Sequence, residues 1–190
     1  MKEIRVSEIR AADPVGDEAD SLYIEGRPIV FDTPTKIRDV FGAYTEIIKR
    51  GALDSADLSD SRLLYNHDLN RVPLARTPKT MELKLDPAGL SMRANLPDTE
   101  EARSIHKAIA RGDLTGMSFG FKVPAGGDEF DPKTNTRTIH KIEKVYEVSI
   151  TPFPAYPTTS VEARAAIQNL TDSSRDELRI KVNQILRRNI

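Results

Sequence analysis

Hydrophobic and polar residues alternate along several short stretches of this chain, a pattern that predicts half-buried β-strands. In the stretch GMSFGFKV (116–123) every second residue is apolar, so a strand there has one face suited to a core. Ser118 falls on the other face, flanked along the chain by Gly116 and Gly120, with almost no side-chain cover beside it. That face carries either an ordinary solvent-facing serine or a nucleophile that is kept accessible.

Similar patterns predict the remaining strands. Alternation and an enrichment in β-branched and aromatic residues predict strands within 21–34, 41–51, 61–68 and 140–150, and a hairpin over 80–97 that turns at Asp86-Pro87-Ala88-Gly89. The glycine- and proline-rich stretch 124–137 predicts a hairpin loop. We therefore expect a fold of the α+β class that is mostly β.

One internal stretch has helical spacing instead. Asp98 is a residue type that favours the N-cap, and Glu101 follows three residues later, which is the spacing of a capping box. Gly112 stands where the end of a helix favours glycine. The stretch between them carries one apolar stripe, formed by Ala102, Ile105, Ala108 and Ile109. A helix is therefore expected here, directly before the strand of Ser118.

Both ends of the chain differ from this middle part. Residues 1–20 are polar and are interrupted between Pro14 and Gly16, which predicts a flexible N-terminal arm. Beyond Thr159 two further capping-box spacings predict two helices. The expected organisation is an arm at 1–20, one domain at 21–160 and a helical C-terminal extension at 161–190.

Composition narrows the classes of function. The 190 residues suffice for one domain, and 28 Lys and Arg nearly balance 29 Asp and Glu, so nothing indicates binding to nucleic acid. The chain has no apolar run of about 18 residues, so we expect no membrane span. It begins without an apolar signal core, which argues against secretion. Cysteine is absent, which excludes disulfides, thiolate catalysis and cysteine-based zinc sites.

The chain has three histidines. His106 lies off the apolar stripe of the predicted helix, and His140 opens a strand among basic residues, so both are expected on the surface. Alternation places His67 on the face of Leu63 and Tyr65, at the end of a core-facing row. A histidine in that position is usually structural, and the spacing of the three does not suit a metal site.

A serine nucleophile needs a base, and the base needs a third group that holds its other nitrogen. Glu147 is the candidate for that group, because it lies with Ser149 on the face opposite Val148 and Ile150. A carboxylate inside an apolar strand needs a partner, since burying an unpaired charge is costly. The alternatives are a solvated face, or a lysine that pairs with Glu147 across the strand. The pattern of residues leaves the choice open.

Several blocks resemble, in order, the prohead (procapsid) maturation proteases of tailed bacteriophages. They are YTEIIKRGAL, LLYNHDLNRVPLART, LDPAGLSMRANLPDTEEARSIHKAIARGDLTGMSFGF and YEVSITPFPAYPTT, and the resemblance covers about residues 21–160. It implies a fold similar to herpesvirus assemblin, a β-barrel-like core flanked by helices to which the predicted helical C-terminal tail is added, and no cofactor. It also implies His67 as base, Ser118 as nucleophile and Glu147 as third member. Assemblins use a second histidine at the third position, so His140 remains a rival to Glu147.

The resemblance implies a serine endopeptidase that forms an acyl-enzyme on Ser118 inside the phage procapsid, in the host cytoplasm. Expected substrates are the scaffold protein or a scaffold-like segment of the major capsid protein, and the protease itself. A homodimer is expected by analogy with assemblins. The C-terminal extension is either a targeting tail removed by self-cleavage or a packing helix. Two alternatives are a non-catalytic scaffold- or capsid-binding module of the same fold, and a ligand-binding β-barrel with Ser118 in its pocket.

Overall fold

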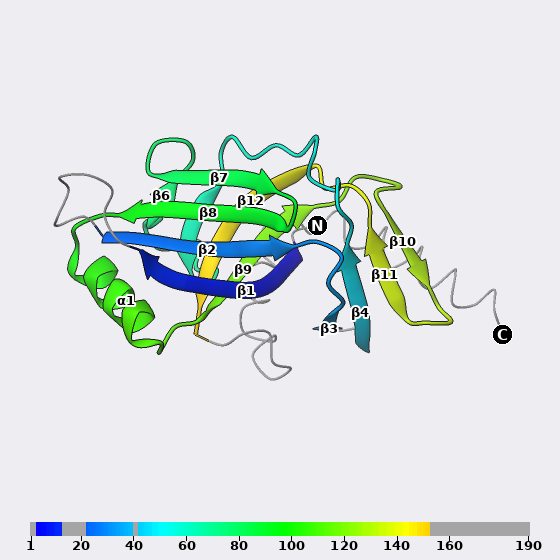
Figure 1. The fold of residues 1–190 in the computed structure, drawn as a ribbon, viewed down its shortest axis with the longest axis horizontal. Helices are drawn as coiled ribbons and strands as arrows, with labels where there is room; N and C mark the ends of the chain where they lie inside the picture. Colours follow the sequence, from blue (N-terminus) through cyan, green and yellow to red (C-terminus); the bar gives the residue numbers. More distant parts are fainter. Residues whose placement is uncertain (1–2, 13–21, 40–41, 153–190) are drawn as a thin grey trace.

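A computed structural model describes residues 3–12, 22–39 and 42–152 of the chain (Figure 1). In these ranges the backbone forms strands and one helix. Their bounds are β1 Glu3–Ala12, β2 Leu22–Val30, β3 Thr35–Asp39, β4 Gly42–Ile48, β5 Arg62–Tyr65, β6 Ala75–Arg76, β7 Met81–Asp86, β8 Gly89–Leu96, α1 Glu100–Arg111, β9 Gly116–Lys122, β10 Asp128–Asp131, β11 Thr136–Ile139 and β12 Lys144–Thr151. The expectation of a mostly β protein is confirmed for this part of the chain.

The strands form two sheets. The larger has the order β6-β5-β12-β9-β1-β2-β8-β7, with β5 parallel to β12 and the other neighbours antiparallel. It bends strongly, so that β9 and β12 run behind β2 and β8 in Figure 1. Apolar side chains of these strands belong to one core, including Ile24, Met92, Phe119 and Val148. The strands of the predicted site thus lie in the middle of a packed sheet.

The two ends of the large sheet approach each other without closing a barrel. The connection between β6 and β7 holds them near one another, because Thr80 N–H donates to the carbonyl of Arg76 and Asn95 N–H donates to the carbonyl of Thr80. β6 and β7 are the outer strands of this sheet and do not pair with each other in the described residues. The expected assemblin-like β-barrel core is therefore not confirmed, since the described strands form no closed barrel. The predicted helices of 161–190 lie outside the described residues.

The expectation of a loose N-terminal arm is wrong for residues 3–12. They form β1, which lies between β9 and β2 and pairs with both in antiparallel register. Residues 3–8 pair with 116–121, so this terminal segment adjoins the strand that carries Ser118. The polar composition of this segment did not predict the strand, because backbone groups of a strand pair with other strands even where its side chains are polar.

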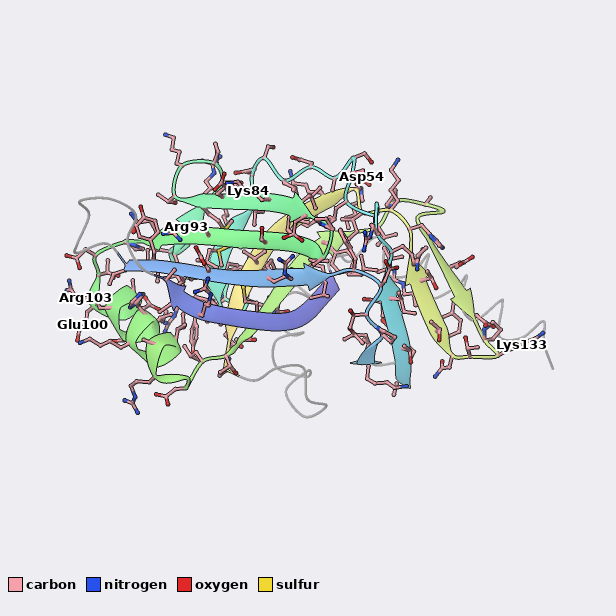
Figure 2. The ribbon with its side chains drawn as sticks, in the orientation of Figure 1. Asp54, Lys84, Arg93, Glu100, Arg103 and Lys133 are labelled. Carbon is pink, nitrogen blue, oxygen red and sulfur yellow. The ribbon has the colours of Figure 1, made fainter. Side chains whose placement is uncertain are left out.

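Helix α1 covers the large sheet beside β1 and β2 (Figure 1). Its apolar stripe is buried at Ala102, Ile105 and Ile109, whereas Glu100 and Arg103 extend away from the sheet in Figure 2. The predicted end at Gly112 is confirmed by a left-handed φ of 82°. The predicted N-cap is off by one residue, since Thr99 and not Asp98 accepts the backbone N–H of Ala102.

The smaller sheet has the order β10-β11-β4-β3 and projects to one side of the large sheet (Figure 1). Its strands β10 and β11 come from the stretch 124–137 and its continuation to Ile139, so the expectation of a loop over that whole stretch is wrong. Buried Glu46 accepts a hydrogen bond from Arg137, which also donates to Asp128. This ion pair belongs to the smaller sheet, whereas Ser118 lies in the larger one.

The predicted hairpin over 80–97 is confirmed, and Asp86 organises its turn. One carboxylate oxygen accepts the backbone N–H groups of Ala88 and Gly89, and both oxygens accept from the guanidinium of Arg27 at 2.7 Å. The hydrogen bonds from Arg27, followed by that from Ala88, lower the pKa of Asp86 to about 2. The carboxylate is therefore ionised wherever the protein is handled near neutral pH.

Gly89 closes this turn at a place with no room for a side chain. Its φ is 152°, and a Cβ atom there would lie 1.9 Å from the carbonyl oxygen of Ile29 on β2. Gly89→Ala is expected to lower the free energy of unfolding by more than about 2 kcal/mol, because backbone must move. Chemical denaturation measures the loss. Gly126→Ala is the matched control, since its φ is 73° and no atom lies within 4 Å of the added Cβ. Equal losses in the two variants would contradict the steric account.

Candidate active site

Ser118 lies in β9, the strand between β12 and β1. Its Cα partner on β12 is Ser149, so the two serines are neighbours on one face of the sheet. Phe119 and Phe121 share the opposite face, where their rings stack with centroids 4.9 Å apart. The predicted alternation of β9 is therefore confirmed.

The expectation of an open serine face is wrong. Every residue from Gly116 to Phe121 is buried, and Ser118 is 0% exposed. Both faces of β9 are covered, which a period-two pattern cannot reveal when the second face consists of Gly, Ser and Gly. The chain thus places a hydroxyl group inside the protein.

The hydroxyl oxygen of Ser118 has no hydrogen-bond partner. It is the one buried side-chain nitrogen or oxygen of the described residues in this condition. Leaving a buried hydroxyl unsatisfied destabilises a fold by about 1–3 kcal/mol. Ser118 therefore contributes nothing to the fold that alanine would not, and a serine in this position calls for a functional explanation.

A β-bulge at Tyr146 determines which way Glu147 faces. Val145 pairs with Phe121 and Glu147 with Gly120, so β12 has one extra residue between these two pairs. In an uninterrupted strand Val145 and Glu147 would share a face. The extra residue turns Glu147 to the face of Ser118 and leaves Val145 in the core, and Tyr146 remains partly exposed.

Glu147 is 1% exposed, and its carboxylate contacts His67 and Ser149. His67 Nδ1 lies 2.8 Å from its Oε1, and Ser149 Oγ donates to its Oε2 at 2.5 Å. A carboxylate oxygen only accepts, so Nδ1 of a neutral His67 carries the proton. The ring is thereby fixed in the tautomer whose Nε2 has the lone pair.

A turn after β5 brings His67 to Glu147. Asn66 N–H donates to the carbonyl of Ile150 at 2.8 Å, which ties the end of β5 to β12. Asn66 and His67 then have left-handed φ values of 51° and 59°. Asn and His tolerate this region better than most residues. His67 is 3% exposed in the resulting position.

The predicted face of His67 was therefore wrong. Leu63 pairs with Val148 and Tyr65 with Ile150, so both lie on the face opposite Glu147 and Ser149. The strand ends at Tyr65, and two left-handed residues break the alternation. His67 joins the face of the serines because of that turn.

The other histidines have other partners. His140 Nε2 lies 2.9 Å from Oε1 of Glu129 on β10, with about half of its side chain exposed. His106 Nε2 lies 3.1 Å from the carbonyl oxygen of Tyr23 and is partly buried, in contrast to the expected surface position. Glu147, and not His140, is the partner of His67 in this structure.

In the described part of the chain, the His, Asp and Glu side chains form no group of three that could hold a metal ion. None of its helices has the length and apolar character needed to cross a membrane.

Sequence reasoning placed Ser149 on the correct face but gave it no role. The signal was present in the segment EVS, because residues i and i+2 of a strand lie side by side on one face. A serine at that distance from a buried carboxylate is a natural hydrogen-bond donor to it.

Comparison with known proteins places the chain in a family. The family model of the caudovirus prohead serine protease matches residues 7–173, and the chain therefore belongs to that family. Membership of this family supports a role as a protease in capsid maturation. A search of the curated proteins found no match.

A solved structure is also similar, that of the capsid assembly protease gp21 of bacteriophage T4. The sequence identity is 13% and the TM-score is 0.49, over 81% of this chain and 98% of the T4 chain.

Removal of the unsatisfied hydroxyl tests the description of Ser118. Ser118→Ala is expected to leave the free energy of unfolding unchanged or to raise it by up to about 1 kcal/mol, because no hydrogen bond is lost. Ser61→Ala is the matched control: Ser61 is equally buried, and its Oγ donates to the carbonyl of Val145 at 2.8 Å. The control is expected to lose about 1–3 kcal/mol in urea denaturation. A similar loss in both variants would show that Ser118 is bonded in solution.

Proposed function

We propose that this chain is a serine endopeptidase in which Ser118 is the nucleophile, His67 the general base and Glu147 the residue that orients His67. The observation that supports it best is the buried contact between His67 Nδ1 and Glu147, on the face of the sheet that carries Ser118. A serine hydroxyl is a weak nucleophile until a base within reach takes its proton. The proposed roles follow from this requirement.

The reaction uses the two ring nitrogens differently. With the proton of Nδ1 donated to Glu147, Nε2 accepts the hydroxyl proton of Ser118 while the oxygen attacks a peptide carbonyl carbon. The imidazolium then gives that proton to the leaving amine, and an acyl-enzyme remains on Ser118. Water attacks the ester with His67 again as base, which releases the acid and restores the serine. The carboxylate of Glu147 stabilises the imidazolium without taking its proton.

The burial of Ser118 sets a condition on this reaction. The hydroxyl is 0% exposed, so a peptide carbonyl reaches it only when the atoms that cover it move. In this proposal those atoms move when the substrate segment binds, or when it is presented inside the assembled shell. The same burial excludes bulk water from the pair of His67 and Glu147 and strengthens their interaction.

The proposed substrates are segments of the scaffold protein or a scaffold-like segment of the major capsid protein, together with the protease itself. The place of action is the interior of the procapsid in the host cytoplasm. Removal of residues 161–190 by self-cleavage and activity as a homodimer belong to the same proposal. Membership of the prohead serine protease family supports the prohead as the place of action. The homodimer rests on the analogy with assemblins.

A second candidate function is a non-catalytic scaffold- or capsid-binding module with the same fold. The full burial of Ser118 favours it, because a nucleophile must meet its substrate. The two functions differ in a single outcome, whether a bound precursor is cut.

Cleavage of a precursor decides between them. The capsid or scaffold precursor from the same phage is incubated with the wild-type protein, Ser118→Ala and His67→Ala, and product termini are identified by mass spectrometry. We expect cleavage by the wild type and a rate at least about a thousandfold lower in both variants, because the triad acts as a unit. The mass of the purified wild-type protein reports self-cleavage at its termini. Binding of precursor without cleavage by the wild type contradicts the protease and supports the module.

A further inference from the structure

Ser149 occupies a position beside the proposed catalytic residues that no step of the reaction uses. It is 0% exposed, and its hydroxyl donates to Oε2 of Glu147, the oxygen that His67 does not contact. It is also the Cα partner of Ser118 on the neighbouring strand. One hydroxyl group thus adjoins both the proposed nucleophile and the proposed orienting carboxylate.

We propose that Ser149 is a positioning residue, which holds the carboxylate of Glu147 in the plane that presents Oε1 to His67; this inference rests on the proposed function. The last torsion of a glutamate side chain is broad and has no sharp staggered minimum. His67 contacts one oxygen of the carboxylate, and a donor on the other oxygen restricts rotation about this torsion.

The geometry of β12 makes Ser149 the suitable donor. Residues 147 and 149 lie on one face of the strand, and the bulge at Tyr146 puts that face toward Ser118. A hydroxyl on a short side chain has little rotational freedom to lose, so its hydrogen bond to an ionised oxygen is favourable and directional. Serine at 149 therefore supports the carboxylate at small entropic cost.

The strands on either side of Glu147 are β9 and β5. Across the face of Glu147, β9 contributes Gly120 and Ser118, which do not titrate. On the other side, β5 contributes Arg62 as the Cα partner of Glu147. The guanidinium of Arg62 donates to Asp60, at 2.8 Å to its carboxylate and 2.9 Å to its carbonyl. Arg62 is thus directed toward Asp60, whereas Ser149 is directed toward Glu147.

The hydrogen bond of Ser149 has a second consequence. Directly opposite residues of an antiparallel pair have Cβ atoms about 4.5–5.5 Å apart, so the hydroxyls of Ser118 and Ser149 are close enough to bond if they turn toward each other. Ser149 is bonded to Glu147 instead, and the oxygen of Ser118 has no partner. Glu147 thereby keeps Ser149 from competing with His67 for the hydroxyl of Ser118.

Ser149→Ala tests the proposal through two readouts in the full-length chain. The first is the pH at which the His67 imidazole titrates, followed by NMR, with His106 and His140 as internal references. Without the donor at Oε2 the carboxylate is held less firmly in the plane that presents Oε1 to the ring, so it stabilises the imidazolium less. The His67 midpoint is therefore expected to fall by about half a pH unit or more. The second readout is the pH profile of kcat/KM on the cleaved precursor.

In that profile the acid limb is expected to move to lower pH by the same amount. kcat is expected to fall roughly tenfold, with KM little changed, because the substrate does not touch Ser149. Ser61→Ala is the control, since it removes a buried serine hydroxyl that bonds to the same strand at Val145 and not to Glu147. It is expected to keep the wild-type midpoint and acid limb. Ser149→Thr keeps the hydroxyl and is expected to keep both as well.

The outcomes separate this inference from the proposed function. A His67 midpoint unchanged by Ser149→Ala overturns the positioning role, whether or not the chain cleaves anything. A shift of equal size in Ser61→Ala also overturns it, because the effect would then be a general one of the strand. Cleavage that survives Ser118→Ala overturns the proposed nucleophile and leaves the titration result standing.

Discussion

A carboxylate inside a β-sheet is the constraint on which the rest of this site depends. Glu147 is almost completely buried, and an unpaired charge in such a place is costly by several kcal/mol. Two side chains stabilise the charge: His67, which follows the end of β5, and Ser149, which lies on β12 with Glu147. The hydrogen bond between His67 and Glu147 also determines the tautomer of the histidine. The same contact between His67 and Glu147 therefore stabilises the buried carboxylate and orients the proposed base.

The two central strands carry this arrangement because both of their faces are used. On one face, the phenylalanines of β9 and the aliphatic residues of β12 form part of the core. On the other face the same strands bring Ser118, Ser149 and Glu147 together. The bulge at Tyr146 lets β12 contribute to both faces, because it places the side chains of Val145 and Glu147 on opposite faces of the sheet. A site built on paired strands is held more rigidly than one on loops.

Much of this could be predicted from sequence. Period-two alternation identified the strands of Ser118 and Glu147 and the face of each residue, and the helix between Asp98 and Gly112 was correct to within a residue or two at its ends. The alternation failed at His67, because two consecutive left-handed residues end the strand and no pattern of hydrophobicity encodes that turn. The alternation also failed to predict the burial of Ser118. The small residues Gly116 and Gly120 suggested an exposed face, whereas this face of β9 is buried. Residues 3–12 were missed because their pairing with β9 spans more than a hundred residues of sequence.

The central claim is that Ser118 is an activated nucleophile whose base is His67. The most direct measurement is labelling of the full-length protein with a fluorophosphonate, with the modified residue located by peptide mass spectrometry. A phosphonyl group on Ser118 in the wild type, and its loss in His67→Ala, is the predicted result. Labelling of Ser118 at the same rate in His67→Ala would contradict the assigned base. No labelling of Ser118 in the wild type, under conditions in which it cleaves its precursor, would contradict the nucleophile itself.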